Sequence, residues 1–247
     1  MSPTRYDALL ESSEYRASRR RKAGLIYALC AERLSEAGTA VDFGAGTGLI
    51  RDALEELSGR PVVGLELDRS FIEAPARMAV ADLLALPLAD ASVDFGIANH
   101  VYEHVADLDR FFAEIARTLA PGGAVYLSAG SRWAPIEPHY RIPTLSWWPE
   151  PVATRILRWS GRGESYGDIR FTTHRSLVET AGRHGLALDD RTDEALKTLL
   201  DRYDGALGRL AGRAVRLAPG SIRGRLLELA SPQWFFFARH AGEVDAP

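Results

Sequence analysis

Polar side chains with hydrogen-bonding oxygens recur where short apolar segments of this sequence end: they are Asp42, Glu66, Asp82 and Asn99. If these segments are parallel strands, their carboxyl ends meet at one edge of a sheet, and ligands of open α/β sheets bind at that edge. A carboxylate there accepts hydrogen bonds from two hydroxyl groups at once. Glu66, at the end of the second segment, therefore predicts the binding of a ribose with two free hydroxyls. The alternative for Glu66 is an exposed acid at a strand end.

The loop after the first of these segments carries three glycines, Gly44, Gly46 and Gly48, in the pattern G-x-G-x-G. Glycines are needed where the backbone takes a positive φ or where a ligand approaches closely. An amphipathic segment begins at Leu49, so a helix N-terminus with unpaired N–H groups stands behind the loop and attracts an anionic group. A dinucleotide loop reads G-x-G-x-x-G, and here the third glycine comes one residue early. The alternative is a glycine-rich turn without a ligand.

The run 41–48, Val-Asp-Phe-Gly-Ala-Gly-Thr-Gly, resembles the first motif of class I S-adenosylmethionine (SAM)-dependent methyltransferases. The resemblance is specific over 38–128 and looser over 171–189 and 233–239. It implies that Asp42 meets the amino group of the methionine moiety, and that Asp82 accepts from the exocyclic amine of adenine while the next backbone N–H reaches the ring. The implied cofactor-binding residues are Asp42, Gly44, Ala45, Gly46, Gly48, Glu66, Leu67, Asp82, Leu83 and Asn99.

Histidines supply the candidates for acid–base chemistry. The segment His100-Val-Tyr-Glu103-His104-Val resembles the stretch after the fourth strand in a methyltransferase subgroup whose motif ends Glu-His-Val. A Glu/His pair invites a metal or an acid–base interpretation. The spacing is not that of a zinc-binding helix and no cysteine is near, so we expect no metal. His104 is expected to be structural or to face the cofactor, and His100 to be catalytic. His139, between Pro138 and Tyr140, is a second candidate base; the alternative is a surface histidine.

The elements that must position these residues alternate between strands and amphipathic helices, and the resemblance implies the fold class. This is a doubly wound α/β fold with a seven-stranded, mostly parallel, Rossmann-like sheet, an antiparallel last strand and a helical cap insertion. The periodicity predicts strands at 41–43, 61–66, 78–83, 93–99, 124–128, 186–188 and 233–238. Asp107 and Thr173 are expected to cap helices, and Pro121-Gly122-Gly123 to form a turn before the fifth strand.

The chain is expected to divide into a core and two insertions. The SAM-binding core comprises 1–130, 171–189 and 233–247. The tryptophan- and arginine-rich segment 131–170 is expected to cover the substrate, and 190–232 to form a helical insertion. Within 205–227 a basic amphipathic helix suggests peripheral membrane contact, with a solvated face as the alternative. Tyr6, Tyr15 and Arg16 are candidates for a lid, whereas the basic cluster 19–22 is expected to be a solvated helix face.

Composition bounds the class of protein. The 247 residues carry a net charge of −3, which gives no support to nucleic-acid binding. The one cysteine, Cys30, excludes an internal disulfide and favours a reducing compartment, so we expect a cytoplasmic location. The sequence contains no run of about 18 apolar residues, so we predict no membrane span. The composition leaves the oligomeric state open.

The resemblance implies methyl transfer from SAM, with S-adenosyl-L-homocysteine as product. The expected acceptor is a small molecule or a glycan or lipid-linked group, and O-methylation is placed ahead of C- or N-methylation. Two alternatives stay open. One is a non-catalytic module with the same fold, and the other is a nicotinamide-dependent oxidoreductase, which the early third glycine opposes.

Overall fold

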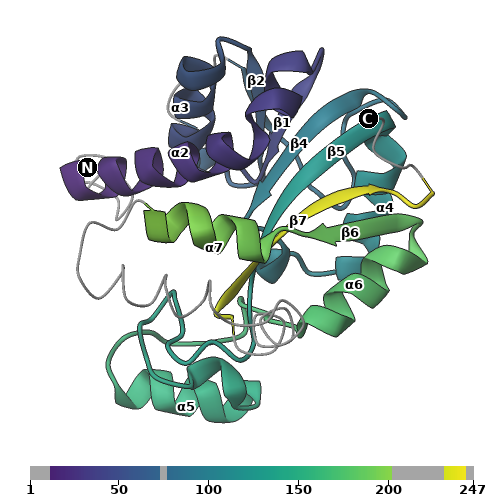
Figure 1. The fold of residues 1–247 in the computed structure, drawn as a ribbon. Coiled ribbons are helices and arrows are strands. Elements are labelled where there is room, and N and C mark those ends of the chain that lie inside the picture. Colours follow the sequence, from purple (N-terminus) through teal and green to yellow (C-terminus); the bar gives the residue numbers. More distant parts are fainter. Residues whose placement is uncertain (1–11, 73–76, 202–230, 243–247) are drawn as a thin grey trace.

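A seven-stranded sheet forms the centre of the protein in the computed structural model, which describes residues 12–72, 77–201 and 231–242 (Figure 1). The strand order is β3-β2-β1-β4-β5-β7-β6. The strands are β1 (Ala40–Phe43), β2 (Val62–Glu66), β3 (Met78–Val80), β4 (Val93–Asn99), β5 (Leu119–Gly130), β6 (Leu186–Asp190) and β7 (Gln233–His240). The order reverses direction between β1 and β4, so the switch point of the sheet lies directly beside the glycine loop.

The first five strands of the sheet are parallel, and β7 runs antiparallel to both of its neighbours. Asp42 is opposite Gly64 of β2 and Ile97 of β4, while Ser128 of β5 is opposite Phe235 of β7. This confirms the predicted mostly parallel sheet with an antiparallel last strand. Because β1, β2 and β4 are parallel, their carboxyl ends share one edge, and the polar residues that end them are brought together.

Helices cover both faces of the sheet. On one face lie α2 (Ser13–Glu36), α3 (Leu49–Ser58) and α7 (Thr192–Asp201), and on the other lie α4 (Leu108–Thr118) and α6 (His174–Arg183) (Figure 1). Successive strand residues point to opposite faces, so Ile97 packs in the core beneath α2 and α3 while Ala98 packs in the core beneath α4 and α6. The chain is therefore a three-layer α/β domain, as predicted.

The segment after β5 forms a small unit with its own apolar core. It contains a 3₁₀ turn, η3 (Leu145–Trp147), and one helix, α5 (Glu150–Trp159). Its core comprises Ile142, Leu145, Ala153, Leu157, Tyr166 and Ile169. The segment returns to the main domain at Arg170, whose backbone N–H donates to the carbonyl of Glu103 at 2.8 Å. This bond fixes the end of the insertion beside the loop that follows β4.

Several predicted boundaries need correction. The third strand ends at Val80, so Asp82 and Leu83 lie in a loop rather than in the strand. The predicted turn 121–123 is instead part of β5, which begins at Leu119 because that residue pairs with Val93 across an irregular register. The segment after β6, expected to be an insertion at 190–232, begins with α7 packed against the sheet; residues 202–230 lie outside the described part.

The predicted helix caps are confirmed. The side chain of Asp107 accepts from the backbone N–H of Arg110, and the hydroxyl of Thr173 accepts from Ser176. Each satisfies one of the free donors at a helix start. Among the described residues, no helix combines the length and the apolar character needed to cross a bilayer.

Candidate functional site

The glycine loop takes a backbone conformation that demands glycine. Gly44, Gly46 and Gly48 all have positive φ, at +68°, +54° and +74°. A Cβ on Gly44 would lie 2.8 Å from Cγ2 of Val101, so this glycine allows the loop to touch the segment after β4. A Cβ on Gly46 would meet nothing within 4 Å. Gly46 therefore borders open space, which is where a ligand can approach the backbone closely.

Glu66 is tied directly to this loop. Its Oε2 accepts from the backbone N–H of Gly46 at 2.8 Å, and its Oε1 accepts from that of Asp68 at 3.1 Å. Each carboxylate oxygen has a second lone pair, so Glu66 can hold the loop and still accept from ligand hydroxyls. The structure brings together the two features that sequence reasoning treated separately, the glycine loop and the strand-end acid.

Asp42 lies beneath the loop rather than on its surface. It is 3% exposed, and burial raises the pKa of its carboxyl to about 7, with Arg51 lowering it and Glu66 raising it further. The predicted contact between Asp42 and a ligand amino group stays a prediction.

Asp82, Leu83 and Leu67 occupy the outer part of this sheet edge. Oδ1 of Asp82 accepts from the backbone N–H of Leu84 at 2.9 Å, which shapes the loop after β3. Leu83 is buried at 8% exposure, whereas Leu67 is 63% exposed beside Glu66. The backbone N–H of Ala81 donates to the Glu66 carbonyl at 2.9 Å, so this loop is fixed against the end of β2.

A cavity of about 490 Å³ lies over the loop and falls in the size range of small-molecule sites. Its wall includes six of the predicted site residues: Gly44, Ala45, Gly46, Asn99, His100 and His139. The other predicted residues, Asp42, Gly48, Glu66, Leu67, Asp82 and Leu83, are not part of the lining. The cavity also includes residues that sequence reasoning did not assign to the site: Arg19, Lys22, Thr47, Ile50, Phe71, His104, Pro138 and Gln233.

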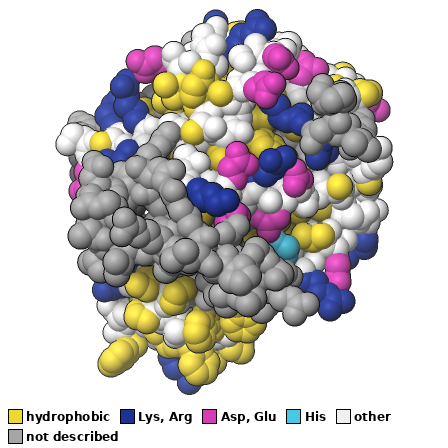
Figure 2. Space-filling model, in the orientation of Figure 1, with side chains coloured by type: hydrophobic (Ala, Val, Ile, Leu, Met, Phe, Trp, Pro, Cys, Tyr) yellow, Lys and Arg dark blue, Asp and Glu magenta, His cyan; other side chains and the backbone are white. Residues whose placement is uncertain are grey.

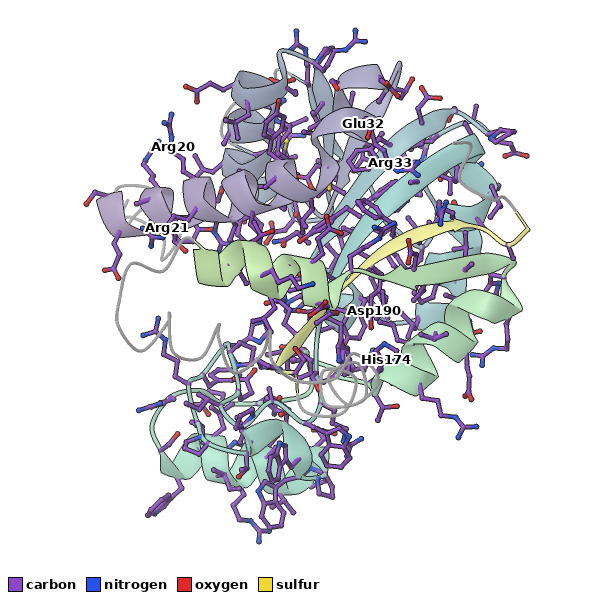
Figure 3. The ribbon with its side chains drawn as sticks, in the orientation of Figure 1. Arg20, Arg21, Glu32, Arg33, His174 and Asp190 are labelled. Atoms are coloured by element: carbon purple, nitrogen blue, oxygen red, sulfur yellow. The ribbon has the colours of Figure 1, made fainter. Side chains whose placement is uncertain are left out.

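The basic cluster 19–22 is divided between solvent and the cavity. Arg20 extends away from α2 and pairs with Glu56 at 3.0 Å, as expected of a solvated face (Figure 3). Arg19 and Lys22, three residues apart on one side of the helix, face the cavity. Burial lowers the pKa of Lys22 to about 8, Arg19 lowers it further and Glu103 opposes the shift. The expectation that this cluster is only a solvated face is therefore wrong for these two residues, and their spacing was the missed signal.

Tyr15, a predicted lid residue, also lines the cavity and lies one turn before Arg19 on α2. The guanidinium carbon of Arg19 lies 4.5 Å from the centre of the Tyr15 ring. Arg16 is exposed and is not part of the wall. Tyr6 lies outside the described residues. The first turns of α2 thus form one side of the cavity, and the expected role of Tyr15 as a lid stays a prediction.

His100 occupies a strained position at the opposite wall. Its φ is +58°, a conformation that non-glycine residues adopt rarely and mostly where function requires it. Its Nδ1 lies 3.0 Å from Oε1 of Glu103, which is fully buried. Burial alone would raise the pKa of Glu103, but the hydrogen bond and charge of His100, with His104, lower it. A buried carboxylate therefore orients the imidazole of His100 toward the cavity.

His139 reaches the same cavity from the insertion and forms a second pair of this kind. Its Nδ1 lies 2.8 Å from Oε1 of the fully buried Glu137, whose Oε2 accepts from the backbone N–H of Tyr140 at 2.6 Å. The rings of His139 and His104 stand edge to face with centroids 5.1 Å apart. By contrast, His174 lies at the start of α6 and pairs with Asp190, remote from the cavity lining (Figure 3).

Comparisons with known proteins place this geometry in a wider context. Residues 41–127 match the family model described as a methyltransferase domain. The chain is 38% identical to malonyl-[acyl-carrier protein] O-methyltransferase 1 of Coxiella burnetii over 90 residues, and these residues are 36% of this chain and 32% of the relative. It is 29% identical to ubiquinone biosynthesis O-methyltransferase of Mesorhizobium japonicum over 177 residues, 66% of this chain and 65% of the relative. The matched part therefore spans between about a third and two thirds of these relatives.

Solved structures share the whole architecture. An S-adenosylmethionine-dependent methyltransferase from Mesorhizobium loti superposes with a TM-score of 0.55, covering 94% of this chain and 100% of that protein. The sequence identity is 17%, so this likeness concerns the fold. The matched segment 41–127 begins in β1 and ends in β5, and it contains the glycine loop, Glu66 and His100.

Proposed function

We propose that this chain, whose residues 41–127 form a methyltransferase domain of the class I SAM-dependent type, transfers the methyl group of SAM to a hydroxyl oxygen of a small-molecule acceptor. The observation that carries the proposal is one cavity with two different walls. One wall is the glycine loop braced by Glu66, and the other presents His100 and His139, each paired with a buried glutamate.

The glycine-loop wall fits SAM. The open space at Gly46 admits the ligand to the backbone, and the remaining lone pairs of Glu66 suit the ribose hydroxyls. Arg19 and Lys22 supply positive charge for the carboxylate of the methionine moiety, and Asn99 offers an amide to the same end of the cavity. The loop after β3, with Asp82 and Leu83, is assigned to the adenine.

The histidine wall fits the acceptor. SAM supplies an electrophilic methyl group: the acceptor oxygen bonds to its carbon as the carbon–sulfur bond breaks, and the electron pair stays on sulfur to give S-adenosyl-L-homocysteine. The proton of the acceptor hydroxyl passes to an imidazole nitrogen of His100 or His139. In each pair the glutamate accepts from Nδ1, which leaves Nε2 as the basic atom.

The insertion 131–170 covers the acceptor. It carries His139 and is held to the main domain by the bond from Arg170 to Glu103. Two of the reported relatives are named O-methyltransferases, which supports oxygen as the methylated atom. The single buried cysteine, Cys30, supports a reducing, cytoplasmic setting.

We also propose that the insertion meets a lipid surface. The helix predicted within 205–227 lies outside the described residues, but another surface supports this contact. We call it the tryptophan surface; it comprises Trp133, Ile136, Trp147, Trp148, Val152 and Trp159, all at least 40% exposed. Figure 2 shows hydrophobic side chains gathered over α5. Indole rings favour the membrane–water interface, and Arg155 and Arg158 of α5 add charge that anionic headgroups attract.

Two experiments test the activity. Calorimetric titration with SAM should give one-site binding, with NADH as the control ligand that should not bind. Release of S-adenosyl-L-homocysteine should then be measured with acceptor panels that differ only in a hydroxyl, an amine or an activated carbon. Turnover confined to the hydroxyl series supports the proposal. Absence of SAM binding would favour a non-catalytic module, and NADH binding would favour an oxidoreductase.

A further inference from the structure

We propose that Glu103, His104 and His139 form a binding site for one divalent transition-metal ion at the wall of the cavity. Each residue offers one ligand atom, and these atoms all lie within 4.8 Å of one another. Two of the residues follow β4, and the third comes from the insertion, 35 residues along the chain from His104. The grouping is a product of the fold and is not visible as a spacing in the sequence.

The separation of the ligand atoms is compatible with a site for one ion. Bonds to zinc from nitrogen or oxygen are about 2.0–2.2 Å long, so two ligand atoms of a tetrahedral site lie about 3.3–3.6 Å apart. The ligand atoms here lie within 4.8 Å of one another, so binding an ion draws them together by about 1 Å. Rotation of the two exposed imidazoles about their side-chain bonds supplies a movement of this size.

Every ligand of the site already has the outer partner that metal ligands need. Metal-bound histidines almost always use their second nitrogen to bond a carboxylate or a backbone carbonyl. His139 uses Nδ1 to bond Glu137 at 2.8 Å, and His104 forms a hydrogen bond with the backbone of Asp168. Glu103 bonds His100 through Oε1 at 3.0 Å. These bonds hold the rings and leave the second nitrogen of each imidazole available to an ion.

A separate observation on Glu103 supports the binding of a cation. Its Oε2 is buried and has no hydrogen-bond partner among the residues that the structure describes. A buried carboxylate oxygen without a partner is costly, because it has lost water and gained nothing in exchange. Glu103 is fully buried and lies in a segment fixed at both ends by backbone bonds, so it cannot turn to solvent. A cation bound to Oε2 removes this cost.

The chemistry of the ligands selects the kind of ion. Two imidazoles and one carboxylate suit zinc and the other late first-row divalent ions, whereas magnesium and calcium prefer oxygen ligands. Three protein ligands leave coordination positions open toward the cavity, as in catalytic metal sites. We therefore assign the site to Zn²⁺ or a similar ion such as Co²⁺.

The role of the ion rests on the proposed function, although its binding does not. An acceptor hydroxyl bound at an open position would lose its proton more readily, because a divalent ion stabilises the oxygen anion. His139 would then be a ligand, and Nε2 of His100 would be the base that removes the proton. If the metal site exists, His100 and not His139 is therefore the general base.

The test is a binding measurement on the full chain after removal of metal with a chelator. Titration with ZnCl₂ is expected to show binding at one site. Titration with CoCl₂ is expected to produce the visible absorption of Co²⁺ bound to nitrogen, and MgCl₂ is expected not to bind. The variant His139→Ala should lose this binding, and Glu137→Gln should weaken it about 10- to 100-fold because it removes the outer partner. His184→Ala is the matched control, since His184 pairs with Asp109 outside the site.

Titration with SAM in the same samples separates the two proposals. His139→Ala should still bind SAM and keep the circular dichroism of the parent, which shows that the variant is folded. Absence of zinc binding in the parent, or zinc binding that is equal in the parent and in both the His139→Ala and His104→Ala variants, overturns the metal site. Zinc binding without SAM binding overturns the proposed function and leaves the metal site standing.

Discussion

Oε2 of Glu66 accepts a hydrogen bond from the backbone N–H of Gly46 at 2.8 Å, so the acid at the end of β2 supports the loop at the end of β1. Gly46 lies in the loop after β1 and Glu66 ends the neighbouring strand β2, 20 positions further along the chain. This bond makes the glycine loop and the acid at the end of β2 one structural unit. A substitution at either residue is therefore expected to change the position of the other.

Replacement of Glu66 by alanine is expected to weaken SAM binding by about 1–3 kcal/mol, because the ribose hydroxyls and the Gly46 N–H lose their acceptor. Glu66→Gln keeps one acceptor oxygen and should show a smaller loss. Calorimetry with both variants provides the measurement. If affinity is unchanged in Glu66→Ala, Glu66 is not part of the binding site.

The substitution Gly46→Ala tests whether the ligand approaches the loop backbone. Its positive φ costs a non-glycine residue about 1–2 kcal/mol, and the added methyl group enters the space assigned to SAM. Gly59→Ala is the matched control, since Gly59 has a φ of +67° and equally open surroundings at the far end of α3. Both variants should lose similar stability in urea, but only Gly46→Ala should lose SAM binding. Equal SAM affinity in the two would contradict the assignment.

Asp42 should make the stability of the protein depend on pH. Burial raises the pKa of its carboxyl in the folded protein to about 7, well above the ordinary value for aspartate, so its contribution to stability is present below about pH 4 and is lost as the pH rises through 7. Asp42→Asn removes the buried charge. The free energy of unfolding of this variant, measured relative to that of the parent, should therefore rise by roughly 2 kcal/mol between pH 5 and pH 8. Parallel pH profiles from urea titrations would refute this.

Lys22 should make SAM binding depend on pH in the alkaline range. Burial lowers its pKa to about 8, with Arg19 lowering it further and Glu103 opposing, so its positive charge is lost between pH 7 and 9. The affinity of the parent for SAM should fall about tenfold over this range, since a charged hydrogen bond contributes about 1.5–3 kcal/mol. Lys22→Arg retains its charge and isolates the effect from the titration of SAM itself. A fall of the same size in Lys22→Arg would exclude Lys22.

The tryptophan surface should bind anionic vesicles. Co-sedimentation with vesicles that contain phosphatidylglycerol is expected for the parent, and Trp148→Ala and Trp159→Ala should each reduce the bound fraction several-fold. Leu57→Ala on α3 is the control, since Leu57 is similarly exposed, at 46%, but lies on another element. Equal sedimentation of the tryptophan variants and the Leu57 control would show that this surface does not meet lipid.

Local sequence determined the loop and the strand ends. Three glycines two positions apart indicated a turn with positive φ, and Glu66 and Asn99 end strands as the apolar runs before them predict, whereas Asp82 lies in the loop after β3. Gly44, Gly46, Asn99 and His100 lie at one edge of the sheet, as expected, and the cavity lies there. The boundaries of β3 and β5 were not determined locally, because they depend on pairing with β2 and β4.

Only the tertiary structure decided which polar residues face the cavity and which support it from behind. Asp42 and Glu66 are both acids that follow apolar segments in the sequence. In the structure Asp42 is buried, whereas Glu66 accepts a hydrogen bond from the glycine loop. Arg19 and Lys22 became cavity residues because α2 lies along the sheet edge. His139 meets His104 only because the insertion is bonded back to Glu103. Contacts between distant segments depend on how elements pack against one another, and no spacing within one segment encodes them.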